Sequence, residues 1–105
     1  MSRLLGNERE LREAVGSGGD AYVLFYAEWC PFCLRFLPRF EALGDNGGGN
    51  FFRIRLAGNT PLFDEFGVEI YPTVLRFRSG QVTGRLDGAR GRGLSEGRLR
   101  QFVGR

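Results

Sequence analysis

Two cysteines separated by two residues, Cys30 and Cys33, are the side chains of this sequence best suited to chemistry. They are the only cysteines among 105 residues, and the only tryptophan, Trp29, directly precedes them in the stretch AEWCPFC. A pair with this spacing can act as a redox dithiol, as half of a metal site or as a structural crosslink. The rest of the sequence discriminates among these three uses.

A metal site is the weakest of the three interpretations. Structural zinc takes four ligands, usually cysteine and histidine, whereas this chain has two cysteines and no histidine. A structural crosslink is also disfavoured, because a bridge across two intervening residues removes little conformational entropy from the unfolded chain. The sequence therefore favours a redox dithiol, and we expect no metal.

The residues around the pair predict a strand followed by a helix. AYVLFYA (21–27) is an aromatic and β-branched run typical of a strand buried on both faces. Beyond the pair, apolar residues recur at helical intervals at Phe36, Phe40 and Leu43. Cys30 is therefore expected near a helix N-terminus, where unpaired N–H groups and the helix dipole favour a thiolate. We expect Cys30 to be an exposed nucleophile and Cys33, one turn further on, a shielded resolving thiol.

Helices and strands are expected to alternate along the rest of the chain. The predicted elements are a short strand at 3–5, a helix capped by Asn7 and ending at Gly16, the strand at 21–27, the cysteine-bearing helix, a strand at 51–57, a short helix starting at Thr60-Pro61, a hairpin turning at Ser79-Gly80 and a last helix capped by Ser95. The glycine-rich segment 44–50 is expected to be a loop. This order indicates an α/β sandwich with a mixed sheet. The length suits one domain over residues 1–105.

The motifs taken together resemble those of the thioredoxin family. VLFYAEWCPFC, a helix that carries Pro38, YPT at 71–73 and a final hairpin and helix are similar to that family over residues 22–103, including the distance from the cysteines to the YPT proline. FYAEWC and YPT resemble the domains of protein disulfide isomerase, and Pro31-Phe32 is similar to glutaredoxin. The glutathione-binding segment that glutaredoxins generally have near their proline is not found here.

The resemblance implies a thioredoxin fold, with a mixed central sheet flanked by helices on both faces, and an oxidoreductase that exchanges disulfides with proteins. Cys30 would be the nucleophile and Cys33 the resolving thiol. The active group would be the Cys30–Cys33 disulfide itself, without a bound cofactor, and electrons would come from a partner reductase.

The resemblance also implies a substrate-binding rim around the dithiol. Pro72 would be cis, and the backbone of Tyr71 would pair with an extended substrate strand. Trp29 and Phe32, with Pro31 between the cysteines, would add apolar surface. For Trp29 the alternative is ordinary core packing, because aromatic side chains are often buried.

The sequence departs from the family pattern where thioredoxins usually carry a buried carboxylate, six residues before the nucleophile. Leu24 occupies that position, and no histidine lies between the cysteines. Both absences remove support for a thiolate, so we expect a reducing or intermediate redox potential and a protein that reduces disulfides. Some other base must then deprotonate Cys33, and the candidates are water and Glu28, with Arg53 of the neighbouring strand holding Glu28 in place. The alternative is that Glu28 and Arg53 are both surface charges.

The composition of the chain limits the kinds of partner that it can bind. The formal charge is +3 and every basic residue is arginine, but twelve acidic residues are interspersed and no dense basic stripe is present, which argues against nucleic-acid binding. No apolar run approaches the roughly 20 residues of a membrane span, and the N-terminus lacks a secretory signal pattern. We expect a cytoplasmic monomer, with a periplasmic or secreted location as the alternative for a trimmed chain.

Two other functions share the expected fold. One is a binding or chaperone module that uses the Trp29/Tyr71 surface while its cysteines are redox-inert. The other is a glutaredoxin-like reductase that uses glutathione.

Overall fold

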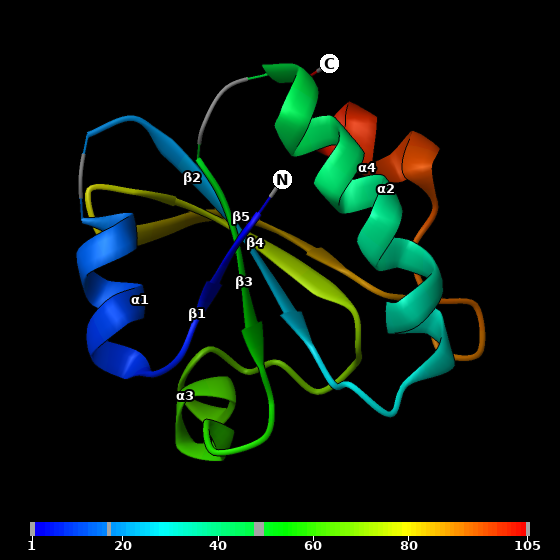
Figure 1. Ribbon diagram of the computed structural model, residues 1–105, viewed down its shortest axis with the longest axis horizontal. Coiled ribbons are helices and arrows are strands. Elements are labelled where there is room, and N and C mark those ends of the chain that lie inside the picture. The colour runs from blue at the N-terminus through cyan, green and yellow to red at the C-terminus, as the bar shows by residue number, and fades with distance from the viewer. Residues whose placement is uncertain (1, 17, 48–49, 105) are drawn as a thin grey trace.

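The computed structural model describes residues 2–16, 18–47 and 50–104 (Figure 1). The elements in chain order are β1 (Arg3–Leu5), α1 (Glu8–Val15), β2 (Asp20–Tyr26), α2 (Pro31–Gly47), β3 (Phe51–Arg55), α3 (Thr60–Glu65), β4 (Thr73–Arg78), β5 (Gln81–Asp87) and α4 (Glu96–Val103). Across these described ranges, no helix combines the length and the apolar character needed to cross a membrane.

The strands form one mixed sheet in the order β1-β3-β2-β4-β5. β2 and β1 run parallel to β3, whereas β4 is antiparallel to both β2 and β5. β2 is the central strand, which explains why its sequence is apolar at successive positions instead of alternating. The mixed α/β sandwich predicted from the order of elements is confirmed.

Helices cover both faces of the sheet, with α1 and α3 on one side and α2 and α4 on the other (Figure 1). Each helix contributes its buried apolar residues to the core on its own side. The face under α2 and α4 is packed by Phe36, Phe40, Leu43 and Leu99, and the opposite face by Leu11, Val15, Leu62 and Phe63. Leu24 of β2 faces α2, and its neighbours Val23 and Phe25 face the other layer.

The predicted caps and the predicted turn are confirmed. Asn7 Oδ1 accepts a hydrogen bond from the Glu10 N–H at 2.9 Å, and Ser95 Oγ accepts one from the Arg98 N–H at 3.2 Å. The β4–β5 turn places Ser79 and Gly80 at positive φ, 52° and 81°, the backbone conformation that a tight hairpin turn requires.

The prediction of a loop over residues 44–50 is wrong for its first part. α2 passes through Pro38 and continues to Gly47, so Gly44 and the residues that follow it belong to the helix. Each glycine costs a helix only about 1 kcal/mol relative to alanine, and a helix that is already nucleated gains a backbone hydrogen bond for each added residue. Residues 48 and 49 lie outside the described residues.

Phe36 anchors α2, and therefore both cysteines, to the sheet. Replacing Phe36 by alanine should lower the free energy of unfolding by about 3–5 kcal/mol, because it leaves a cavity where a buried ring was packed. Urea denaturation followed by circular dichroism measures this loss. Leu34→Ala is the matched control, since Leu34 lies in the same helix but is exposed and should change stability by no more than about 0.5 kcal/mol. Equal losses in the two variants would contradict this account of the buried face of α2.

Candidate active site

The two cysteines lie where β2 gives way to α2. The Cys30 N–H donates to Ala27 O at 3.1 Å, which turns the chain, and Cys30 O accepts the Leu34 N–H at 3.1 Å. This second bond is the first i to i−4 bond of α2, so Cys30 occupies its N-cap position and Cys33 lies in its first turn. Pro31 suits the first helical position because the N–H it lacks has no partner within the helix. Both thiols are free.

The thiols differ in exposure in the predicted order, but Cys30 is less exposed than we expected. Cys30 is 5% exposed and Cys33 is 1% exposed. The expectation of an openly exposed nucleophile is therefore wrong in degree. The backbone before β4 lies against this thiol, with the Cys30 Sγ 3.7 Å from Tyr71 O, where it donates a weak hydrogen bond.

Cys33 is held as a neutral thiol. Burial is the main reason that its pKa is raised to about 12, because the thiolate would lose its hydration. A hydrogen bond and a charge interaction with Cys30 raise the pKa further, and a hydrogen bond from the backbone at Ala27 partly opposes them. Leu24 is fully buried in the same cluster, so its position supplies packing and no proton acceptor.

The Tyr71–Pro72 peptide bond is cis, as the resemblance implies, and it lies beside the dithiol. Trp29 is 71% exposed and meets the Tyr71 ring edge-on, with ring centroids 6.2 Å apart. The alternative that Trp29 packs in the core is therefore wrong. Trp29 and Tyr71 form an aromatic surface next to Cys30.

Phe32 lies between the two cysteines in sequence and packs inward. It is half-buried against the core, and the guanidinium of Arg35 lies 5.7 Å from its ring centroid. Gly93, in the segment before α4, packs so closely that a Cβ there would approach Phe32 Cβ to 2.8 Å, and its φ is +71°. Glycine is thus required at this position by both space and backbone conformation.

Glu28 pairs with Arg55, at 3.1 Å, so the prediction that Arg53 holds it is wrong. The sheet register explains the difference. Arg55 is opposite Tyr26 at the end of β2, two residues before Glu28, whereas Arg53 is opposite Leu24. From there Arg53 reaches Glu41 of α2 at 3.2 Å.

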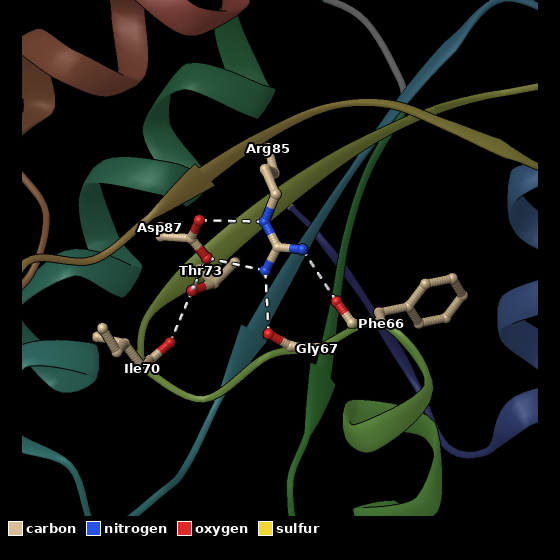
Figure 2. Close-up of polar contacts among 6 residues, drawn as sticks. All are labelled: Phe66, Gly67, Ile70, Thr73, Arg85 and Asp87. Carbon is tan, nitrogen blue, oxygen red and sulfur yellow. Dashed lines mark hydrogen bonds and ion pairs between the residues drawn. The ribbon is translucent and has the colours of Figure 1, made fainter.

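A polar network beside the Tyr71–Pro72 segment was not predicted from the sequence. Arg85 and Asp87 of β5 interact with each other and with backbone and side-chain groups around that segment (Figure 2). The one available signal was that two opposite charges two residues apart in a strand point to the same face. The segment of the chain that the structure describes contains no cluster of three or more histidine, cysteine or acidic residues arranged to hold a metal ion.

This fold and site define an α/β protein that carries a dithiol at a strand-to-helix junction, next to a cis-proline. The family model described as Thioredoxin matches residues 4–101, and the chain belongs to the thioredoxin family.

Named relatives agree with this membership. The chain is 34% identical over 74 residues to protein disulfide-isomerase A3 of Gallus gallus, a match that covers 69% of this chain and only 15% of that protein. Among solved structures it is similar to thioredoxin of Malassezia sympodialis, with a TM-score of 0.88 and 20% identity over 99% of this chain and 89% of that one. It is also similar to thioredoxin of Fasciola hepatica, with a TM-score of 0.85 and 24% identity over 97% of this chain and 96% of that one. The structural likenesses establish the fold.

The raised pKa of Cys33 predicts the pH dependence of its alkylation. In a Cys30→Ser variant, the rate of Cys33 alkylation by iodoacetamide should rise about tenfold per pH unit from pH 7 to 9, because only the thiolate reacts and burial keeps the pKa of Cys33 well above this range. Mass spectrometry of quenched samples gives the rates. The urea-unfolded variant is the control, and its rate should level off near the ordinary thiol pKa of about 8.5. A plateau below pH 9 in the folded protein would contradict the prediction.

Proposed function

We propose that this protein is a thiol–disulfide oxidoreductase that reduces disulfides in protein substrates. The observation that carries the proposal is the pair of free thiols at the start of α2. Cys33 is more deeply buried than Cys30, and Cys30 lies against the backbone of the Tyr71–Pro72 segment. Membership of the thioredoxin family supports it. Cys30 acts as the nucleophile and Cys33 as the resolving thiol.

The reaction proceeds in two exchanges. The Cys30 thiolate attacks one sulfur of a substrate disulfide, forming a mixed disulfide and releasing the other substrate sulfur as a thiolate. The Cys33 thiolate then attacks Cys30 Sγ, so that the Cys30–Cys33 disulfide forms and the second substrate thiol leaves. The substrate gains two electrons, and a partner reductase returns two electrons to the protein. No bound cofactor is needed.

The protonation of Cys33 orders these two steps. A neutral, buried Cys33 does not compete with Cys30 for the incoming disulfide. Once Cys30 is bound in the mixed disulfide it has neither charge nor S–H, so the two interactions with Cys30 that raise the pKa of Cys33 disappear, and burial remains, opposed by the hydrogen bond from the backbone at Ala27. Formation of the intermediate therefore prepares the second nucleophile.

The surroundings of Cys30 suit an extended polypeptide. The Tyr71 backbone next to Cys30 can pair with a substrate strand. Exposed Trp29 offers apolar contact beside Tyr71, and half-buried Phe32 adds apolar surface between the cysteines. Because Leu24 and Pro31 give no support to a thiolate, we expect a reducing or intermediate redox potential.

Insulin reduction by dithiothreitol tests the proposal. The wild type should accelerate precipitation of the insulin B chain, followed by turbidity. Cys30→Ser should abolish the acceleration, because the first exchange has no nucleophile. Cys33→Ser, mixed with insulin without dithiothreitol, should stop at a mixed disulfide detectable by mass spectrometry, because no resolving thiol releases the substrate.

Aggregation of insulin in that assay, and a second assay with glutathione, separate the competing functions. A wild-type protein that prevents aggregation and keeps this property in Cys30→Ser would be a binding module. Turnover of a small disulfide with glutathione alone would indicate a glutaredoxin-like reductase.

We further propose that Glu28 accepts the proton of Cys33 during the second exchange. Glu28→Gln should slow release of the mixed disulfide about a hundredfold between pH 6 and 8, the smaller end of general-base effects. Rapid-quench mass spectrometry of a preformed mixed disulfide measures this rate. Glu41→Gln is the matched control, because Glu41 is a carboxylate in an ion pair with Arg53 and has no role in the proposed transfer. Equal rates for wild type and Glu28→Gln would eliminate Glu28 as the base.

A further inference from the structure

Arg85 joins the start of the segment that carries Tyr71 and Pro72 to the edge of the sheet. Its Nη1 donates to Phe66 O at 3.0 Å and its Nη2 to Gly67 O at 3.2 Å. These carbonyls lie at the C-terminal end of α3, where helix carbonyls lack intrahelical partners and a cation is favourable. One guanidinium therefore fixes the point at which the segment leaves α3 (Figure 2).

Asp87 sets the orientation of that guanidinium. Arg85 Nε and Nη2 donate to the two Asp87 carboxylate oxygens at 3.0 and 2.9 Å, a bidentate arrangement that restricts the plane of the group. The pair is possible because residues two apart in β5 face the same side of the sheet. The register places Asp87 opposite Thr73 and Arg85 opposite Leu75.

The same carboxylate lies at the other end of the segment. Thr73, the first residue of β4, donates its hydroxyl to Ile70 O at 2.6 Å, and its Oγ1 lies 3.4 Å from Asp87 Oδ1. Gly88, which follows Asp87, passes so close to Pro72 that a Cβ there would come within 2.6 Å of Pro72 O. Both ends of the 66–73 segment therefore contact one short stretch of the chain, from Arg85 to Gly88.

Packing alone does not support the segment on this side. An open hollow of about 380 Å³ lies beside it, lined by Gly67, Glu69, Ile70, Arg85 and Asp87. The Arg85 and Asp87 side chains are 39% and 45% exposed, so their loss should leave the core intact. Val68 holds the segment from the core side, and on the open side hydrogen bonds from Arg85 fix its backbone.

We propose that Arg85 is a positioning residue that holds the Tyr71–Pro72 backbone where an extended substrate can pair with it. The inference rests on the proposed disulfide-exchange function. It assigns Arg85 no role in the chemistry of the sulfurs. Consequently, its loss should impair disulfides carried on a polypeptide and spare small disulfides that react with Cys30 without pairing to the backbone.

Steady-state kinetics with two substrates test this assignment. For a disulfide-linked peptide, Arg85→Ala should raise KM about fivefold with little change in kcat, the signature of lost binding that is equal in the ground and transition states. The rate with 5,5′-dithiobis(2-nitrobenzoate) should stay within about twofold, as expected if the sulfur chemistry is untouched. Arg85→Lys keeps one charge but cannot reach both carbonyls and Asp87 together, so its KM for the peptide should lie between those of the wild type and Arg85→Ala.

Arg78→Ala is the matched control, because Arg78 forms a comparable exposed ion pair with Asp20 at 3.0 Å on the neighbouring strand. It should leave both substrates unchanged. An unchanged peptide KM in Arg85→Ala would overturn the inference. Equal losses of activity with both substrates, together with a lower melting temperature, would also overturn it. Such a result would indicate that Arg85 has a structural role only.

Amide hydrogen exchange provides a readout that does not depend on activity. The Gly67 and Val68 N–H groups donate to Asp64 O and Phe63 O at 3.1 and 2.9 Å. In Arg85→Ala these two amides should exchange about tenfold faster, because local opening becomes easier, and in Arg78→Ala they should not. Faster exchange together with an inactive wild type would refute the proposed function alone, whereas unchanged exchange would refute the positioning role alone.

Discussion

The antiparallel register between β2 and β4 is the constraint on which the site depends. It pairs Phe25 with Thr73, so Tyr71, two residues before Thr73, lies just past the end of β2, toward the point where the chain turns into α2. That geometry brings the Tyr71 carbonyl to the Cys30 thiol. A shift of one residue would move Tyr71 and would also turn Val74 and Leu75 toward the opposite layers of the core, which the packing on both sides of the sheet forbids.

The site is also part of the hydrophobic core. Cys30 and Cys33 belong to the same buried cluster as Leu24, Phe36 and Leu99. The contacts that stabilise the fold therefore also exclude water from the Cys33 thiol and raise its pKa. Stability and reactivity share the same atoms here, so substitutions in this layer will change both.

Features determined by local sequence could be predicted well. The caps at Asn7 and Ser95, the turn at Ser79 and the central strand each follow from a few neighbouring residues. The end of α2 could not be predicted from local propensity, because an established helix extends through residues that would not start one.

Features determined by contacts between distant segments were the ones missed. The pairing of Glu28 with Arg55 depends on where β2 and β3 end relative to each other. The limited exposure of Cys30 depends on a backbone segment 41 residues away in sequence. The contact of Arg85 with the end of α3 likewise needs the β4–β5 register, which no local pattern specifies.

The single tryptophan of the chain is exposed to solvent immediately before Cys30 in sequence, with its ring edge-on to Tyr71. All indole fluorescence from this protein therefore originates beside its dithiol, because no second tryptophan contributes to the emission. The molecule thus contains a native optical reporter through which occupancy of the rim can be followed without any attached dye.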